Sequence, residues 1–309
     1  MEKKKEQASL VMVVIAFVTV YIVWGSTYFF IQQALSGFPP FLLGAVRFII
    51  AGLLMLAYCI MKGEKVFDSK LIPHAAVGGF FMLFIGNGIV IWVEQTLPSA
   101  VTAIMVSSSP LWFVVLDKPK WSSNFSNAAI IAGIALGFVG VILLFGERIM
   151  HSFSPLGGKT EIIGLALLSV GVIGWAGGSL YVKYKIKTNN ALVSTTWQIL
   201  AGGLAFVPGI FLLDEYRQFD WHAVPVKAWL SLIYLVLMGS IAAFSAYVWL
   251  LQVRSATQVS TYAYVNPVVA VLLGVFVGGE NISLVPVIGL AIILGSVLLI
   301  NMGGKKVKS

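Results

Sequence analysis

Ten apolar segments, each about as long as a bilayer is thick, constrain what this chain can fold into. The gaps between them are short and contain helix breakers such as Pro39-Pro40 and Pro98. Backbone polar groups cannot face lipid unpaired, so the segments must form helices packed in one bundle. The sequence therefore predicts an all-α integral membrane protein. The predicted spans are approximately 10–35, 39–61, 71–93, 98–116, 127–145, 161–181, 191–213, 227–249, 257–277 and 284–302.

Composition and charge agree with a lipid environment. Apolar residues make up 59% of the chain and charged residues 10%, whereas soluble domains have roughly 25% charged residues. The net charge is +8, but the basic residues lie between apolar segments and form no exposed stripe, so we expect a bilayer as partner and no nucleic acid. The single cysteine, Cys59, excludes an intramolecular disulfide. The first apolar segment is too long for a signal peptide and should remain as the first span.

The distribution of lysine and arginine predicts the orientation of the chain. With the N-terminus inside, fifteen of these residues fall in the inside segments, four in the outside segments and one, Arg47, within a span. Cytoplasmic segments of membrane proteins carry this excess of positive charge. Both termini are therefore predicted to face the cytoplasm, which requires an even number of spans.

The chain also contains an internal repeat. Residues 85–116 and 242–273 match at an offset of 157, which places Trp92 on Trp249, Gln95 on Gln252 and Pro110 on Pro267. Ten spans in two halves give five per half, and an odd number reverses the direction in which the second half enters the membrane. We therefore predict an inverted repeat, a common design of secondary transporters. Its parts are 1–146, 161–302 and a basic cytoplasmic tail, 303–309.

Several short motifs follow one another along both halves of the chain. They are Trp24-Gly25-Ser26-Thr27, Arg47-Phe48, Ala51-Gly52, Pro98-Ser99-Ala100, Trp197-Gln198, Ala201-Gly202, Asn266-Pro267 and Gly279-Glu280. In their order and spacing, nearly the whole chain, about 10–302, resembles the EamA-type ten-helix permeases of the drug/metabolite transporter superfamily. The resemblance implies a multi-pass plasma-membrane (inner-membrane) permease with a central cavity, usually exporting metabolites, amino acids or drugs. Many members end the fourth helix of both halves with Gly-Glu, but the first half here has Leu116-Asp117-Lys118, so a role for that glutamate cannot be carried over.

Aromatic and polar residues within the spans are candidates for substrate binding. Tryptophans normally collect at the bilayer edges, yet several here fall inside spans, among them Trp24, Trp92, Trp175, Trp197 and Trp249. Flat rings with polar tips suit amphipathic molecules, although each ring could equally serve in packing. The predicted cavity lining is Trp24, Thr27, Asn87, Gln95, Trp175, Trp197, Gln198, Tyr262 and Asn266.

Two ionisable residues and two prolines are further candidates. A central arginine costs roughly 2.5–3.5 kcal/mol on insertion scales, so Arg47 is either an anchor for a substrate carboxylate, a member of a gating ion pair, or a structural residue bonded to carbonyls. Glu94 is a candidate for proton coupling if burial raises its pKa, and otherwise an interfacial glutamate. Pro110 and Pro267 free carbonyls that either bind a polar group or are satisfied locally, beside Ser109 and Asn266.

Catalysis has little support in the sequence. His74, His151 and His222 have no acidic or cysteine partners at ligand spacing, and no phosphate-binding glycine loop precedes a helix, so we expect no metal site and no cofactor. The prediction is a secondary transporter that exports small amphipathic molecules by alternating access. The alternatives are an importer or antiporter of the same fold, and an intramembrane enzyme acting on a lipid or isoprenoid. The GxxxG pair Gly133/Gly137 permits either a homodimer or packing within the chain.

Overall fold

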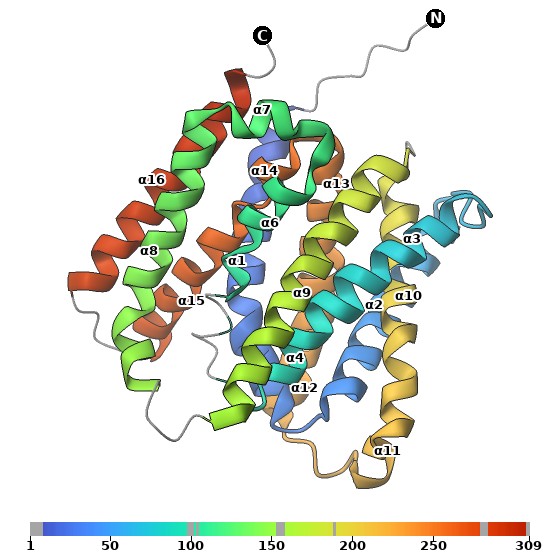
Figure 1. Cartoon of the computed structure of the whole chain (residues 1–309). Helices are drawn as coiled ribbons and strands as arrows, with labels where there is room; N and C mark the ends of the chain where they lie inside the picture. The colour runs from blue at the N-terminus through green and yellow to red at the C-terminus, as the bar shows by residue number, and fades with distance from the viewer. Residues whose placement is uncertain are drawn as a thin grey trace, which may run out of the picture.

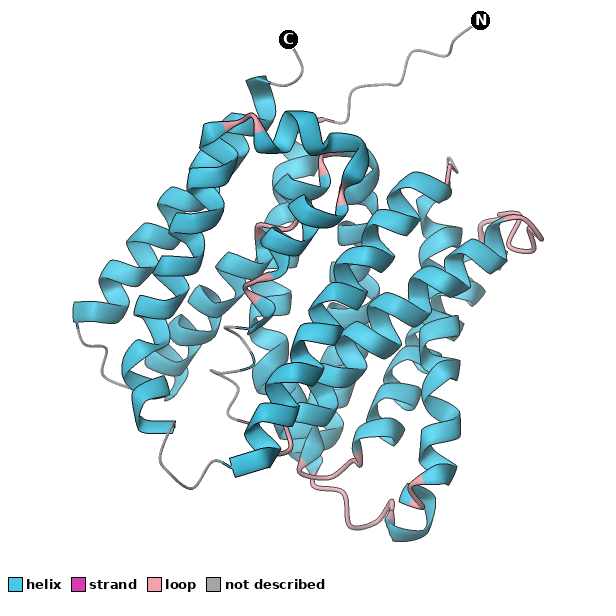
Figure 2. Ribbon diagram, in the orientation of Figure 1, coloured by secondary structure: helices cyan, strands magenta, loops and turns pink. Residues whose placement is uncertain are grey.

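The computed structural model describes residues 9–97, 102, 105–152, 158–187, 190–278 and 284–306. Every regular element within these ranges is helical (Figure 2). The motifs Pro98-Ser99-Ala100 and Gly279-Glu280 lie outside the described residues. The elements in chain order are α1 (Leu10–Leu35), α2 (Pro40–Met61), α3 (Leu71–Gly79), η1 (Phe80–Asn87), α4 (Gly88–Val93), α6 (Ser109–Leu116), η2 (Lys118–Lys120), α7 (Trp121–Phe125), α8 (Ala128–Ser152), α9 (Gly158–Lys185), α10 (Ala191–Leu212), α11 (Glu215–Gln218), α12 (Val226–Tyr234), η3 (Leu235–Ala243), α13 (Phe244–Val253), α14 (Ala256–Val259), α15 (Tyr262–Gly278) and α16 (Leu284–Lys306).

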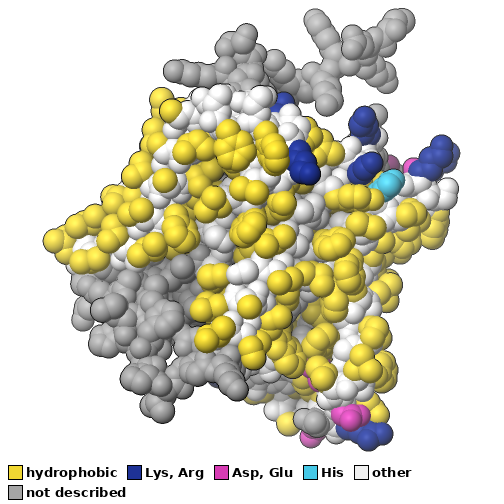
Figure 3. All heavy atoms as spheres, in the orientation of Figure 1, with side chains coloured by type: hydrophobic (Ala, Val, Ile, Leu, Met, Phe, Trp, Pro, Cys, Tyr) yellow, Lys and Arg dark blue, Asp and Glu magenta, His cyan; other side chains and the backbone are white. Residues whose placement is uncertain are grey.

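The helices have the lengths and the surface that a membrane protein requires. Six stretches are long and apolar enough to cross a bilayer, and a seventh is added if Lys118–Phe125 and Ala128–Leu143, which meet at 94°, form one bent span. Apolar side chains cover the visible face of the bundle (Figure 3). The count of ten spans stays a prediction. The six stretches are Leu10–Leu35, Pro40–Met61, Leu71–Val93, Ile162–Lys185, Ala191–Leu212 and Val226–Val253.

Two of these stretches contain a π-helical segment at corresponding places. η1 occupies the middle of the third predicted span, and η3 occupies the middle of the eighth. Shifting η1 by the repeat offset of 157 gives 237–244, which overlaps η3 closely. The wider turns of a π-helix rotate the residues beyond it around the helix axis and are frequent at functional sites.

Helix α2 begins with a contact between the two halves of the chain. Pro40 lies in its first turn, where the missing N–H costs no hydrogen bond. The next two backbone N–H groups, of Phe41 and Leu42, donate to the two carboxylate oxygens of Glu215 in α11 at 3.1 and 2.8 Å. A carboxylate at this position also interacts favourably with the helix dipole. A residue of the second half thus caps a helix of the first.

Small residues set how closely the helices pack. A Cβ at Gly133 would lie 2.7 Å from Ile300, and a Cβ at Gly137 would lie 2.6 Å from the ring of Tyr264. The GxxxG face of α8 is therefore occupied by α16 and α15 of the same chain. α2 packs along α10, α1 along α15, and α9 along η1 (Figure 1). These contacts surround Arg47 of α2, which bonds to Asn87 of η1 and to Ser240 of η3.

Candidate functional site: a cavity between the two halves

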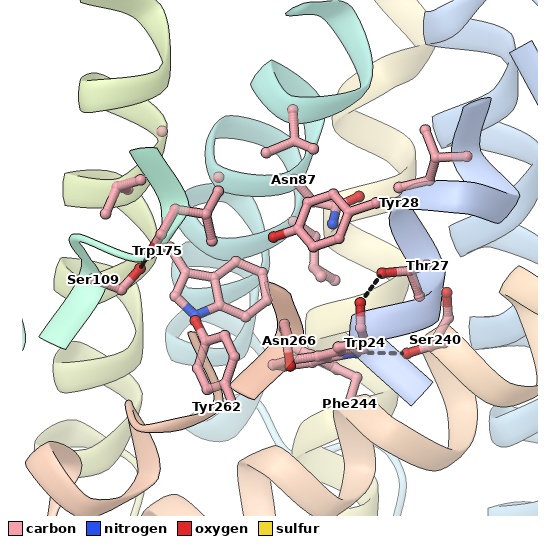
Figure 4. Close-up of a pocket in the computed structure, with 18 of the residues that line it drawn as sticks. Trp24, Thr27, Tyr28, Asn87, Ser109, Trp175, Ser240, Phe244, Tyr262 and Asn266 are labelled. Carbon is pink, nitrogen blue, oxygen red and sulfur yellow. Dashed lines mark hydrogen bonds between the residues drawn. The ribbon is translucent and has the colours of Figure 1, made fainter. Parts of the chain in front are cut away.

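A cavity lies inside the bundle, and both halves of the chain contribute to its wall (Figure 4). It holds about 690 Å³ of empty space, counting the part open to solvent. Seven of the eleven residues that the sequence singled out line it: Trp24, Thr27, Arg47, Asn87, Trp175, Tyr262 and Asn266. The other lining residues are Tyr28, Ile31, Phe48, Leu83, Gly86, Val90, Val106, Ser109, Gly171, Val172, Gly239, Ser240 and Phe244.

Four aromatic rings form one wall of the cavity and support it from behind. The ring of Trp24 lies 5.3 Å from that of Trp175 and 5.0 Å from that of Tyr262, both edge to face, and 4.9 Å from that of Tyr247. Trp24 Nε1 donates to the Gly239 carbonyl at 3.2 Å, and Trp175 Nε1 donates to the Tyr247 hydroxyl at 3.0 Å. Because each indole N–H is already bonded, the rings offer mainly flat apolar faces.

Arg47 is buried beside this wall, with 3% of its surface exposed. Nε donates to Ser240 Oγ at 2.9 Å, and Nη1 lies 3.4 Å from Asn87 Oδ1. The guanidinium carbon lies 4.7 Å from the centre of the Phe48 ring. Within the described parts of the chain no carboxylate forms an ion pair with Arg47. Neutral groups from η1 and η3 therefore hold a buried cation at the cavity.

The carbonyls freed by the two prolines are satisfied locally, which answers one of the alternatives left open by the sequence. Pro110 removes the usual partner of the Val106 carbonyl, which accepts from Ser109 Oγ at 2.6 Å. Pro267, inside α15, does the same to the Ala263 carbonyl, which accepts from Ser107 Oγ at 2.9 Å. The prolines and the two carbonyls correspond at the 157-residue offset, whereas both donors belong to the first half.

Asn266 differs from these satisfied groups. Its side chain lines the cavity and is 2% exposed, but its Oδ1 accepts no hydrogen bond from any described residue. A buried acceptor without a donor is unfavourable in the native state. The residue at the corresponding position of the first half, Ser109, also lines the cavity. The arrangement leaves one unused acceptor on the cavity wall.

Glu94 lies next to the cavity but does not line it. It follows the last residue of the span Leu71–Val93 and is 5% exposed, and neither carboxylate oxygen has a hydrogen-bond partner among the described residues. Burial raises the pKa of Glu94 well above its usual value. Tyr28, which does line the cavity, is close enough to interact electrostatically with it.

Three residues singled out from the sequence lie elsewhere. Gln95 is exposed, and its Nε2 donates to the Trp92 carbonyl at 3.0 Å. Trp197 Nε1 donates to the Val66 carbonyl at 2.7 Å, on the side of α10 that faces the loop after α2. Gln198 is fully buried and donates to Ser194 Oγ at 2.9 Å. Their part in substrate binding stays a prediction.

Sequence reasoning missed Tyr28, Phe244 and Tyr247, which lie in apolar segments without a distinctive motif. A signal was available for one of them. At the 157-residue offset, Phe244 corresponds to Asn87, which the sequence had singled out and which lines the cavity. Tyr247 corresponds to Val90, an apolar residue that gave no such signal.

Apolar helices around an internal cavity beside a buried arginine are features of multi-pass helical membrane proteins, membrane transporters among them. The sequence also matches the profile of one known family. The chain belongs to the EamA-like transporter family, whose profile matches residues 11–146 and again residues 162–302. This family is one of transporters, which are not a class of enzyme.

Individual relatives agree with this assignment. The uncharacterized inner membrane transporter YedA of Escherichia coli strain K12 is 34% identical over 298 residues, which cover 93% of this chain and 90% of that protein. The uncharacterized transporter YetK of Bacillus subtilis is 30% identical, over 84% of this chain and 77% of its own. A solved crystal structure covers 96% of this chain with a TM-score of 0.75 and 19% identity, which supports the fold alone. The chain is thus a multi-pass protein of the cell membrane.

Proposed function

We propose that this protein is a secondary transporter that exports small amphipathic molecules, such as metabolites, amino acids or drug-like compounds, by alternating access. The observation that carries the proposal is the cavity, because its wall combines side chains from both halves around one buried arginine. A site shared between two bundles can open to either side when the bundles rock against each other. A gradient or an exchanged solute would supply the energy.

The proposed architecture is ten helices in an inverted 5+5 repeat, with repeats at 1–146 and 161–302 and a tail at 303–309. The packing of the helices supports it. α1 contacts η3 and α15, and α9 contacts their counterparts in the first half, η1 and α6. α2 pairs with its counterpart α10, and α8 pairs with α16. Exchanging the halves maps this set of contacts onto itself, as expected for twofold-related bundles.

Both termini are proposed to face the cytoplasm. α1 begins and α16 ends at the same end of the bundle (Figure 1). Most of the lysine and arginine side chains visible on the molecular surface lie toward that end (Figure 3). This asymmetry is the one that membrane proteins have between their cytoplasmic and outer sides.

The proposed substrate-binding residues are the seven candidates that line the cavity, with Arg47 as the charged anchor. Glu94 is proposed to carry a proton, because it is buried and burial raises its pKa above the usual value for a carboxylate. Gln95, Trp197 and Gln198 could contribute only in a second conformation that brings them to the cavity.

The test is solute counterflow in liposomes containing the purified protein, with a panel of amino acids, amines, nucleosides and carboxylates. We expect accelerated exchange for one class, with the solute recovered chemically unchanged. Trp24→Ala should reduce that exchange strongly, whereas Trp249→Ala, outside the cavity, should preserve it.

No accelerated exchange for any class would count against transport, and a chemically altered lipid would favour the enzyme alternative. Dependence on a pH gradient or on an internal solute would separate proton coupling from substrate antiport.

A further inference from the structure

We propose that the cavity recognises a small organic anion that has a flat apolar body and a hydrogen-bond donor. Arg47 binds the anionic group, and the Asn266 carboxamide oxygen accepts from the donor. This inference rests on the proposed transport function and names the substrate class for it. Three independent features of the cavity carry it.

The first feature is the charge of the cavity. Arg47 is the one ionisable cation among the described lining residues, and the hydrogen bonds of its Nε and Nη1 go to neutral oxygens. A guanidinium has five N–H donors in a fixed fork that matches a carboxylate. Burying a charge is costly unless an opposite charge compensates it. An anionic ligand would provide that compensation when it enters the cavity.

A glycine packs closely beside the guanidinium. A Cβ at Gly239 would lie only 3.0 Å from Arg47 Nη2 and 3.3 Å from the Thr27 side chain. Any side chain at position 239 would therefore press on the guanidinium edge. Because Gly239 has no side chain, only backbone borders Arg47 Nη2 on this side of the cavity.

The geometry argues against a gating ion pair for Arg47 in this conformation. Glu94 has no hydrogen-bond partner among the described residues and forms no ion pair with Arg47. A closed ionic gate requires two opposite charges in contact. Arg47 instead borders the empty space, where a ligand can reach it.

The second feature is the unused acceptor. Asn266 Oδ1 is buried on the cavity wall, on α15, and receives no hydrogen bond within the described part of the chain. A hydroxyl or N–H of the ligand would satisfy it. The observation is independent of Arg47, because the two residues lie on helices of different halves. Arg47 can donate hydrogen bonds to a ligand, and Asn266 Oδ1 can accept one from it.

The third feature is the apolar part of the cavity wall. Trp24, Trp175, Phe244 and Tyr262 present rings to the cavity (Figure 4). Stacked and edge-to-face contacts favour a flat ligand over a branched one.

The test compares four ligands that share a phenyl ring: 3-phenyllactate, 3-phenylpropanoate, 3-phenylpropanamide and 2-phenylethylamine. Binding to the detergent-purified protein is measured from the shift in melting temperature, since a ligand that binds the native state stabilises it. We expect both carboxylates to bind about tenfold or more tighter than the amide or the amine. Phenyllactate should bind more tightly than phenylpropanoate because its hydroxyl can donate to Asn266.

Matched variants assign each preference to its residue. Arg47→Gln should abolish the preference for carboxylates over the amide, whereas Arg217→Gln, whose side chain is 69% exposed, should preserve it. Asn266→Leu should remove the advantage of phenyllactate over phenylpropanoate while keeping the preference for carboxylates. If Arg47→Gln fails to fold, Arg47→Lys keeps the charge and should weaken both carboxylates in parallel.

Equal or tighter binding of the amine or the amide by the wild-type protein would overturn the inference. So would a preference for carboxylates that survives Arg47→Gln. Other results would contradict the transport proposal. Carboxylates that bind but never exchange in liposomes would refute transport, and exchange of amines or nucleosides without anions would refute only the substrate class.

Discussion

Arg47 Nε and Ser240 Oγ, 2.9 Å apart, join α2 of the first half to the π-helical segment η3 of the second. Ser240 Oγ itself donates to the Leu235 carbonyl at 3.0 Å, which turns a lone pair toward the guanidinium. Asn87 of η1 approaches the same guanidinium from the first half. The two corresponding π-helical segments therefore orient one cation, and this contact predicts how the anion site responds to mutation.

Ser240→Ala should weaken anion binding without changing the charge of the cavity. The substitution removes the acceptor of Arg47 Nε, and hydrogen bonds to charged groups contribute about 1.5–3 kcal/mol. We expect the half-saturation concentration of a carboxylate in counterflow to rise about tenfold, with a smaller change in the maximal rate. Ser240→Thr retains a hydroxyl and serves as the control. An equal loss for carboxylate and amide solutes would show that Ser240 does not act through Arg47.

The positions of the helices could be predicted well from the sequence, and the reason is physical. Lipid requires long apolar segments with satisfied backbones, so the predicted span 10–35 corresponds to α1 and 191–213 to α10 within a residue. The π-helical segments could not be predicted. An apolar segment looks the same whether its backbone bonds run to the fourth or the fifth residue, and only the surrounding packing decides.

The chemical character of the cavity could be predicted from the sequence, but only some of the residues that line it could be. Trp24 and Asn87 were singled out as unusual residues inside spans, and they line it. Trp197 was singled out in the same way, but the rotation of α10 turns it to the Val66 carbonyl. An apolar span has little amphipathic pattern, because lipid and protein interior are both apolar. The direction of a side chain around its helix therefore requires the structure.

Tyr247→Phe should destabilise the aromatic wall of the cavity. The Tyr247 hydroxyl is fully buried, accepts from Trp175 Nε1 at 3.0 Å and lies 2.6 Å from Ser179 Oγ. Removing it leaves the indole N–H without its acceptor, which costs about 1–3 kcal/mol. We expect a lower melting temperature in detergent and a changed tryptophan emission spectrum. Tyr58→Phe, on the exposed face of α2, should leave both unchanged.

Glu94→Gln should change how stability depends on pH. Because burial raises the pKa of Glu94 above its usual value near 4.5, the folded state binds a proton that the unfolded state has released. The contribution to stability is therefore fully present below pH 4.5 and is lost as the pH rises through the raised pKa, by up to about 1.4 kcal/mol per unit. The variant should match the wild type at low pH and exceed it near pH 8, as measured by chemical or thermal unfolding in detergent.

The same variant tests proton coupling in transport. If Glu94 carries the proton, Glu94→Gln should keep solute exchange and lose the acceleration by a pH gradient. Asp214→Asn provides the control, because that carboxylate is exposed and its contact with Arg217 is a surface pair of little energetic consequence. Unchanged pH-driven flux in Glu94→Gln would exclude the coupling role and leave only the effect on stability.

Gly79→Ala should disrupt the contact between α3 and α10. A Cβ at Gly79 would lie 2.0 Å from the carbonyl oxygen of Gln198, a backbone atom that cannot move without displacing the helix. Overpacking of this kind typically costs about 1–3 kcal/mol, and a backbone clash belongs at the upper end. We expect a large fall in melting temperature and in the yield of monodisperse protein. Gly177→Ala is the matched control, since beyond the adjacent turns of its own helix no atom of the described residues lies within 4 Å of the added carbon, and the substitution favours the helix. Comparable stability of the two variants would mean that α3 and α10 lie farther apart in the membrane than in this structure.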